Sequence, residues 1–157
     1  MLNDYLQFAK TQTQEETSLI DLSDVLNVIK KKLNNDNLIL ENFTKICLKG
    51  RLTSLTRCFE NVIQNSLTYG EKVYVKVQEG TNIVTIFIED DGPGIPEEQY
   101  KNVFKPFVRL DKSRNLNKSG VGLGLAIVED IVNSHGGNIQ LGKSKYKGLQ
   151  VRISLPF

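Results

Sequence analysis

The sequence predicts a single domain of the mixed α+β class. Segments with the apolar spacing of amphipathic helices alternate irregularly with short runs of β-branched residues, and no internal repeat is present. The chain has 157 residues, of which 39% are hydrophobic, and this is enough to bury one core. Because no low-complexity linker divides it, we expect one unit over residues 15–157, preceded by a short helical appendage over residues 1–14.

The first half of this unit is expected to contain two amphipathic helices. Asp21 or Ser23 can cap the first helix, whose apolar residues form one face. The second helix is long and stops at Gly70, because glycine commonly ends helices. The expected elements are helices over residues 21–35 and 51–69 and short strands around residues 38–40 and 45–49.

The second half is expected to be mainly β. Alternating and β-branched residues flank the turn-like residues 79–82, which is a strong hairpin signal. Pro96 suits the first turn of a short helix, and the polar segment over residues 105–120 lacks periodicity and predicts a loop. The expected elements are strands over residues 72–77 and 83–89, helices over 96–104 and 121–134, and strands over 138–142 and 149–155.

Charge and composition exclude several function classes. The net charge of +2 is too small to indicate a nucleic-acid partner. Two cysteines, Cys47 and Cys58, and one histidine, His135, cannot form a zinc cage or a disulfide framework. No apolar stretch reaches the length of a membrane span, so we expect this fragment to be soluble, and we also expect it to be monomeric.

A pair of carboxamides lies on one side of the long helix. At roughly 100° per residue, Asn61, Asn65 and Thr68 share a face opposite to the apolar one. An amide pair one turn apart can bind a polar ligand, although a solvated helix surface carries the same pattern. Glu60 and Gln64 have the same spacing in an alternative register. The residues expected on the buried face are Leu52, Leu55, Phe59, Val62, Ile63 and Ser66.

The run Asp-Asp-Gly-Pro-Gly-Ile over residues 90–95 is a second candidate site. A strand ends at Asp90, and Gly92 and Gly94 let the backbone turn sharply and approach a ligand closely. A buried carboxylate here can accept a hydrogen bond from an exocyclic amine. An ordinary strand-ending turn has the same composition, so the motif alone leaves both interpretations open.

Three glycines spaced by two residues precede the last helix. Gly120, Gly122 and Gly124 leave backbone N–H groups and the helix dipole free to meet phosphate oxygens, which predicts an anion site. The run is neither a dinucleotide fingerprint nor a Walker loop, because its spacing differs and no Gly-Lys-Ser/Thr follows. The preceding loop is cationic, which fits a lid over polyphosphate better than a solvated charged loop. Its basic residues are Lys101, Lys105, Arg109, Lys112, Arg114 and Lys118.

Taken in order, the motifs resemble those of the sensor histidine kinases. The motifs similar to the N, G1, F and G2 boxes of that family are Asn61-x-x-x-Asn65, Asp90-x-Gly92-x-Gly94, Phe104-x-x-Phe107 and Gly120-x-Gly122-x-Gly124. The resemblance covers residues 18–157 and is greatest to the osmolarity-sensing subfamily, while residues 1–14 resemble the end of a second dimerisation helix. It implies a two-layer α/β sandwich of the gyrase, chaperone and histidine-kinase ATPase superfamily, with a mixed sheet packed on three helices and a flexible lid.

The resemblance also implies roles for particular residues. ATP and Mg²⁺ would bind between helices and sheet, with Asp90 accepting from the adenine amino group and Asn65, beside Asn61, ligating Mg²⁺. Lys105 and Arg109 would contact phosphate from the lid. The other residues implied for the nucleotide site are Tyr69, Gly92, Gly94, Ile95, Phe107, Gly120, Val121, Gly122, Leu123 and Gly124. The large apolar members of this set could equally belong to the core.

Three features of the chain bear on the expected activity. Thr68 stands where relatives often have a Lys or Arg that reaches phosphate, which predicts weaker ATP binding. Asn61 stands where ATP-hydrolysing relatives have a glutamate base, and an amide cannot take a proton from water. No segment similar to the family's acceptor-histidine motif is present, and His135 is expected to be a structural cap in its imidazolium form, which a helix C-terminus favours.

The implied function is that of the catalytic domain of a protein-histidine kinase. It would transfer the γ-phosphoryl group of ATP to a histidine on a dimerisation domain outside this chain, for relay to the receiver domain of a response regulator. The full-length protein would be a homodimer anchored in the bacterial inner membrane, with this domain in the cytoplasm. The alternatives are a serine-directed kinase of the same fold and a nucleotide-binding module without transfer activity.

Overall fold

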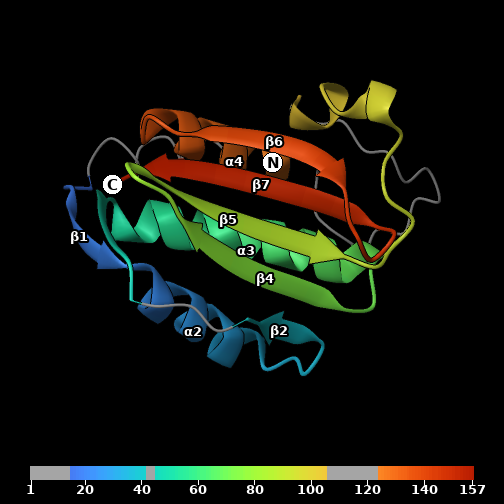
Figure 1. The fold of residues 1–157 in the computed structure, drawn as a ribbon, viewed down its shortest axis with the longest axis horizontal. Coiled ribbons are helices and arrows are strands. Elements are labelled where there is room, and N and C mark those ends of the chain that lie inside the picture. Colours follow the sequence, from blue (N-terminus) through green and yellow to red (C-terminus); the bar gives the residue numbers. More distant parts are fainter. Residues whose placement is uncertain (1–14, 42–44, 106–123) are drawn as a thin grey trace.

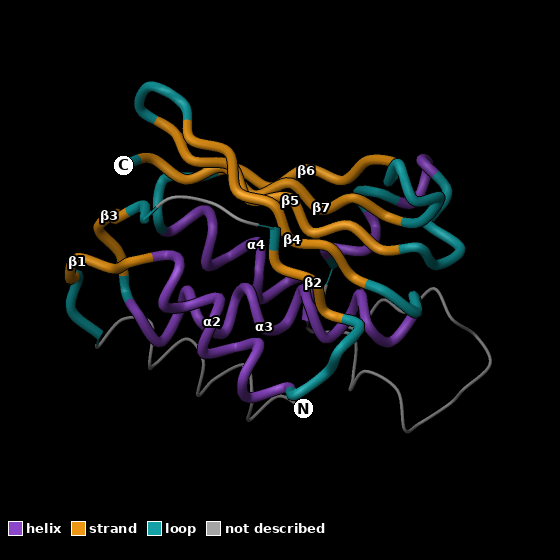
Figure 2. The backbone as a smooth tube through the Cα atoms, turned by 60° about the horizontal axis from the view of Figure 1, so that its bottom comes forward, coloured by secondary structure: helices purple, strands orange, loops and turns teal. Residues whose placement is uncertain are grey.

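A five-stranded mixed sheet forms one layer of the fold (Figures 1 and 2). The computed structural model describes residues 15–41, 45–105 and 124–157. The strand order is β2-β4-β5-β7-β6, in which β2 is parallel to β4 and the other neighbouring pairs are antiparallel. The strands are β2 (Leu38–Leu40), β4 (Val73–Glu79), β5 (Ile83–Asp90), β6 (Asn138–Lys143) and β7 (Leu149–Pro156).

Three helices form the second layer, which lies below the sheet in Figure 2. Alternate residues of the sheet point toward these helices and pack with them into one apolar core. The two-layer α+β arrangement predicted from the sequence is therefore confirmed, whereas the predicted appendage over residues 1–14 lies outside the described residues. The helices are α2 (Leu22–Leu33), α3 (Leu52–Tyr69) and α4 (Gly124–Ser134).

The buried face of α3 agrees with the prediction except at its first residue. Five of the six expected residues are buried, but Leu52 is 49% exposed. Leu52 is the first residue of α3, next to the Arg51 N-cap, and lies at the edge of the helix's packed face. In the ranges that the structure describes, no helix is both long and apolar enough to span a bilayer.

A short strand before α2 is absent from the sequence-based prediction. β1 (Ser18–Asp21) pairs antiparallel with β3 (Cys47–Gly50) in a separate two-stranded sheet. Ile20 is the one buried residue of β1, so four residues carry too short a pattern to distinguish a strand from a helix start.

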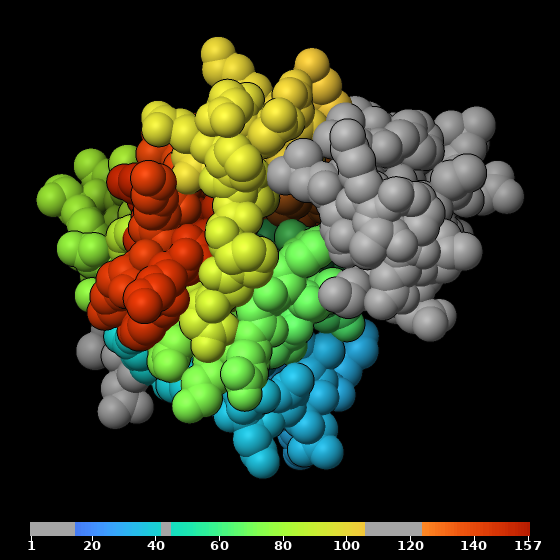
Figure 3. All heavy atoms as spheres, turned by 90° about the vertical axis from the view of Figure 1, so that its right-hand side faces the viewer, coloured from blue at the N-terminus to red at the C-terminus, as the bar shows by residue number. Residues whose placement is uncertain are grey.

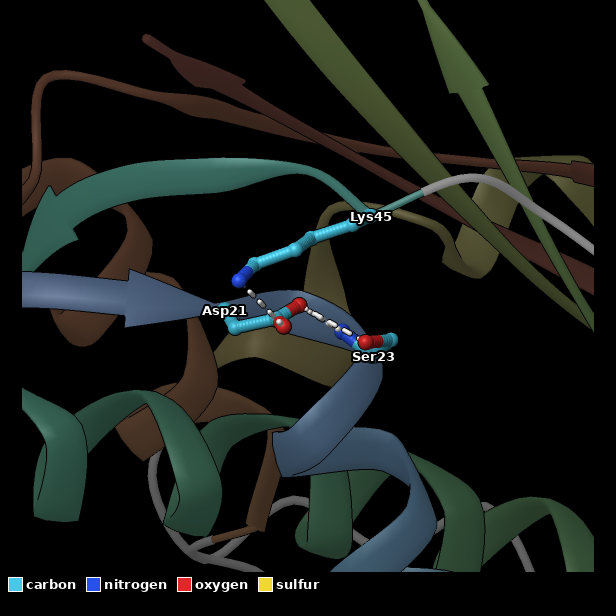
Figure 4. A network of polar contacts seen from close by, with 3 residues as sticks. All are labelled: Asp21, Ser23 and Lys45. Carbon is cyan, nitrogen blue, oxygen red and sulfur yellow. Dashed lines mark hydrogen bonds and ion pairs between the residues drawn. The ribbon is translucent and has the colours of Figure 1, made fainter.

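Asp21 caps helix α2, as the sequence predicts (Figure 4). Its Oδ1 accepts hydrogen bonds from the backbone N–H of Ser23 at 2.9 Å and from the Ser23 hydroxyl at 2.7 Å. Its Oδ2 lies 4.0 Å from Nζ of Lys45. The hydrogen bonds from Ser23 lower the pKa of Asp21 below its usual value, so the cap stays ionised at neutral pH.

The predicted helix over residues 96–104 is wrong. The chain forms two separate 3₁₀ turns instead, η1 (Glu97–Gln99) and η2 (Asn102–Phe104). Val103 is the one buried residue of these two turns. A nine-residue segment with one buried side chain lacks the apolar face that would hold an α-helix against the core, and helices of this length are unstable alone.

Distant parts of the chain cap the N-terminus of α3. The Glu15 carboxylate accepts hydrogen bonds from the backbone N–H of Thr53 at 2.8 Å and of Ser54 at 3.2 Å. Partial burial alone would raise the pKa of Glu15, but these hydrogen bonds outweigh it and lower the pKa. The backbone N–H of Arg51 donates to Nε2 of His135, at the end of α4, over 3.1 Å. The chain that enters the domain and the end of α4 therefore meet at one end of α3.

The expected imidazolium form of His135 is wrong, although its structural role is confirmed. Nδ1 lies 2.8 Å from the carbonyl oxygen of Ile131, and Nε2 accepts from Arg51, so the tautomer that satisfies both contacts is neutral and protonated on Nδ1. Burial lowers the pKa of the imidazole below its ordinary value of 6.5, and the Arg51 charge adds to this effect. Desolvation therefore outweighs the attraction of the helix C-terminus for a cation.

We expect His135 to make the free energy of unfolding depend on pH. Because its pKa is lower in the folded chain than the ordinary 6.5, the stabilisation is complete above that value and is lost as pH falls below it. In urea denaturation at pH 7.5 and at a series of lower pH values, the free energy of unfolding should fall more steeply with falling pH for wild type than for His135→Gln. His135 is the chain's one histidine, so its titration can be followed directly by NMR. Equal pH dependence of the two proteins would contradict this prediction.

Candidate functional site

Asp90 is the last residue of β5 and the centre of the candidate site. It is 3% exposed, whereas most aspartates in proteins are largely solvated. Its Oδ1 accepts hydrogen bonds from the backbone N–H of Gly92 at 2.9 Å and of Leu149 at 3.2 Å. Among the described residues, the direct hydrogen bonds to this carboxylate all end on Oδ1, which leaves Oδ2 available to a ligand.

Asp90 and its neighbour Asp91 have pKa values shifted in opposite directions. Burial raises the pKa of Asp90, and the nearby charge of Asp91 adds to the rise, while the hydrogen bonds from Gly92 and Leu149 oppose it. Backbone hydrogen bonds from Lys72, at 2.9 Å, and from Glu71, at 2.7 Å, lower the pKa of Asp91. Asp91 therefore holds the α3–β4 turn in place, and Asp90 is the carboxylate with capacity for a ligand.

The loop after β5 lies directly against the C-terminal end of α3 (Figure 3). A Cβ built on Gly92 would lie 2.6 Å from the carbonyl oxygen of Tyr69, the last residue of that helix. Only glycine fits such an approach, so the helix end accounts for Gly92, whereas the close approach of a ligand stays a prediction. Gly94 has φ +73°, and Ile95 packs partly buried against the core, as the alternative interpretation of Ile95 expects.

The carboxamides of α3 lie on the same stretch of helix as Tyr69. Asn65 and Asn61 precede Tyr69 by about 6 and about 12 Å along the helix axis. Both are half-buried, so neither belongs to a fully solvated surface. The structure therefore brings Tyr69, Gly92 and Asp90 together, and Asn65 and Asn61 lie about one and two turns before Tyr69 on the same helix.

One member of the alternative register on α3, Glu60, makes an ion pair with another helix. Oε1 of Glu60 lies 2.8 Å from Nζ of Lys32, and the Glu60 side chain is 15% exposed. Glu60 therefore bridges α3 to α2. Gln64 is exposed, and its backbone carbonyl oxygen accepts a hydrogen bond from the Thr68 hydroxyl at 2.9 Å, so this bond does not involve the Gln64 side chain.

The structure describes only some of the remaining predicted site residues. Gly124 is the first residue of α4 and is exposed. Lys105 is exposed and borders an open groove of about 700 Å³, next to Phe104 and to Leu141 of β6. Asp90 and the carboxamides of α3 do not line this groove, and the contact of Lys105 with phosphate stays a prediction. The predicted residues outside the described ranges are Phe107, Arg109, Gly120, Val121, Gly122 and Leu123.

The sequence analysis missed Gly148 and Leu149, which touch Asp90 from the turn between β6 and β7. A Cβ built on Gly148 would lie 2.1 Å from Oδ1 of Asp90 and 2.3 Å from its carbonyl oxygen. A lone glycine before a strand is an ordinary turn signal, and nothing in the local pattern relates it to a residue so far away. The one signal in the sequence is Gly148 itself, because a glycine beside a strand allows another part of the chain to approach the backbone closely.

Together the fold and the site define a two-layer α+β domain with a polar site at the end of a central strand. The chain belongs to the family of histidine kinase-, DNA gyrase B- and HSP90-like ATPases, whose model matches residues 50–157. This finding confirms the family and the fold class that the motifs predict.

Known relatives are sensor kinases. The chain is 32% identical to the sensor protein kinase WalK of Staphylococcus haemolyticus, over 99% of this chain and 28% of that protein. The NMR structure of the histidine kinase domain of the Escherichia coli osmosensor EnvZ has a TM-score of 0.67 at 37% identity, covering 91% of each chain. The mycobacterial sensor histidine kinase MprB has a TM-score of 0.77 at 26% identity, covering 90% of this chain and 97% of that one.

The chain corresponds to one part of its relatives. It spans 22% to 28% of the length of the curated sensor kinases that it matches. The chain is therefore an ATPase domain of the kind found in sensor histidine kinases.

Proposed function

We propose that this domain binds Mg-ATP, with the base read by Asp90 and the phosphates and metal held along α3. The observation that carries the proposal is the buried Asp90 carboxylate, in which two backbone N–H groups hold Oδ1. A fixed, desolvated carboxylate oxygen is a strong acceptor for the 6-amino group of adenine. Gly92 contacts both Asp90 and Tyr69, and we assign Tyr69, Gly92, Gly94 and Ile95 to the surroundings of the base.

The carboxamides of α3 suit a divalent cation already paired with phosphate. Amide oxygens are ligands of hard cations, and Mg²⁺ in proteins usually combines a few side-chain oxygens with phosphate oxygens. We assign Asn65 as the ligand and Asn61 as its neighbour. Bound Mg²⁺ would neutralise charge on the phosphates. The predicted contacts of Lys105, Arg109 and the glycine run over residues 120–124 complete the proposal.

The whole protein, in this proposal, transfers the γ-phosphoryl group to a histidine of a dimerisation domain. Asn61 lacks a basic atom, so it cannot activate water, and ATP bound here persists until an acceptor histidine is brought in line. The phosphoryl group then passes to the receiver domain of a response regulator. We place the full-length protein as a homodimer in a bacterial inner membrane, with this domain in the cytoplasm.

Two measurements test this function. Titration with ATP, with and without Mg²⁺, should move the NMR amide signals of Asp90, Gly92 and Leu149, and an unmoved spectrum at saturating ATP would overturn the proposal. Mixing the domain with a separately produced dimerisation domain and γ-labelled ATP should place the label on histidine. Label on serine would support the serine-directed kinase, and no label would support a binding module without transfer.

Thr68→Lys is expected to strengthen ATP binding by roughly three- to tenfold, because it adds a cation one turn beyond Asn65. In the wild-type chain the Thr68 hydroxyl donates to the backbone carbonyl oxygen of Gln64, on the same helix. Calorimetric titration at two salt concentrations checks the prediction, since a new charge contact weakens with salt. Thr68→Gln is the control for side-chain length, and an unchanged affinity of the lysine variant would show the prediction to be wrong.

Glu60→Gln is expected to leave the slow rate of ATP hydrolysis unchanged. Its carboxylate bridges to Lys32, and a bridge to a side chain that is 65% exposed contributes only about 0.2–1 kcal/mol to stability. Lys32→Ala is the matched control, because it breaks the same bridge from the other side. Loss of hydrolysis in a folded Glu60→Gln protein would instead favour the register of Glu60 and Gln64.

A further inference from the structure

The turn between β6 and β7 is folded back over the outer face of the sheet. The Tyr146 ring stacks on the ring of Tyr74, with centroids 3.9 Å apart and planes 13° from parallel. Tyr74 belongs to β4, and β5 lies between β4 and β7 in the sheet. The side chain of Tyr146 therefore reaches across the strand that carries Asp90.

The turn has a defined internal shape. The backbone N–H of Ser144 donates to the carbonyl oxygen of Gly148 at 2.9 Å, and the Ser144 hydroxyl oxygen accepts from the N–H of Tyr146 at 2.9 Å. Lys147 adopts φ +81°, an uncommon value for a residue with a side chain. Such a conformation persists only where its surroundings determine it, which here are these hydrogen bonds and the Tyr146 stack.

Glu89 fastens the same turn to β5. It is 7% exposed and lies opposite Tyr74 on one side and Gln150 on the other. Its Oε1 lies 3.3 Å from the backbone nitrogen of Lys145 and 3.3 Å from Nε2 of Gln150, and both groups donate to it. A buried carboxylate with two donors is a strong attachment point.

The end of the turn determines the orientation of Asp90. Gly148 packs against Oδ1 of Asp90 so closely that no side chain fits between them, and the next residue donates its N–H to the same oxygen. Figure 3 shows the red atoms of this part of the chain beside the yellow chain that leaves β5. A displacement of the turn therefore moves a hydrogen-bond donor of Asp90 and changes the direction in which Oδ2 points.

We propose that Tyr146 and Glu89 are positioning residues for purine selection: they hold the β6–β7 turn, which orients Asp90 to accept the 6-amino group and reject a 6-oxo group. A carboxylate facing a carbonyl oxygen places two acceptors together, so a rigid Asp90 disfavours inosine nucleotides, and a mobile one disfavours them less. This inference rests on the proposed function, because it concerns how the same site selects its base.

The experiment compares the dissociation constants of ATP and ITP for wild type and four variants. In Tyr146→Ala and in Glu89→Ala the preference for ATP over ITP should fall by about two- to tenfold, the range that loss of one aromatic or charged contact produces. Tyr146→Phe keeps the stacked ring and should retain the wild-type preference. Two variants on different elements keep the test available if one of them fails to fold.

If Tyr146 and Glu89 only stabilised the fold, their substitution would lower the melting temperature and leave the preference for ATP over ITP unchanged. Phe87→Ala removes another half-buried aromatic ring from the outer face, at a position opposite Lys76 and Arg152 and away from the turn. It should lower the melting temperature without changing the ATP to ITP ratio. If Tyr146→Ala and Glu89→Ala also lower only the melting temperature, the inference is overturned and the proposed function is unaffected. If wild type binds neither nucleotide, both are overturned.

Discussion

Asp90→Asn is expected to weaken ATP binding by roughly ten- to a hundredfold, the cost of replacing a charge-assisted acceptor with an amide. The asparagine oxygen can still accept the two N–H groups that now reach Oδ1. Its amide nitrogen, in contrast, would face the adenine amino group donor to donor. The same geometry presents a donor to a 6-oxo purine, so binding of ITP should become stronger relative to ATP.

The domain should be as stable after this substitution as before it, or more stable. Burial raises the pKa of Asp90 above the ordinary 3.8, which means that the folded chain binds this proton more tightly than the unfolded chain. The contribution of Asp90 to stability therefore falls as pH rises from 3.8 through the raised pKa, and it stays low at pH 7. Asparagine removes this cost because it is neutral.

Urea denaturation at pH 7 and below pH 3.8 separates the two effects. The stability gain of Asp90→Asn should be present at pH 7 and vanish at the lower pH, where the aspartate of wild type is also neutral. Isothermal titration with ATP and ITP at pH 7 gives the affinities. A variant that binds ATP like wild type would exclude Asp90 as the group that reads the base, and a variant less stable than wild type at pH 7 would contradict the stability prediction.

The two elements that carry this site, α3 and β5, were predictable because their patterns are local. The apolar spacing of α3 and the glycine at position 70 predict both helix ends, and the observed helix covers Leu52–Tyr69. The alternating residues around the turn at 79–82 predict the hairpin that ends at Asp90. Sequence periodicity therefore places Asn61, Asn65 and Asp90 on their elements before any contact is known.

The contacts that hold Asp90 in place were not predictable, because they join residues far apart in the chain. Leu149 lies 59 residues after Asp90, and the Glu15 cap of α3 reaches a residue 38 positions away. Burial also changes the protonation state of a side chain, which rules based on the local sequence do not predict. The helix-end rule predicts a charged His135, whereas desolvation lowers its pKa. Phe107, Arg109 and the glycines at 120 and 122 stay predictions.

Asn65→Ala is expected to remove the part of ATP affinity that depends on Mg²⁺. Loss of a residue that only orients a metal ligand commonly costs about ten- to a hundredfold in metal affinity, and loss of the ligand itself should cost at least as much, so ATP binding in Mg²⁺ should fall to the level that wild type shows with a chelator. Alanine is the best helix former, so α3 should persist in the variant. Titration with ATP in Mg²⁺ and in EDTA measures the ATP affinity of each protein with and without the metal.

The matched control lies one residue away. Gln64→Ala removes an exposed carboxamide from the same helix and should keep the full effect of Mg²⁺. AMP separates the two ends of the site, because it carries the base that Asp90 reads but lacks the β- and γ-phosphates that share the metal. Asn65→Ala should therefore bind AMP like wild type, whereas Asp90→Asn should bind it more weakly. If Asn65→Ala kept its dependence on Mg²⁺, the metal would have to be held elsewhere, and the assignment of the α3 carboxamides to it would be wrong.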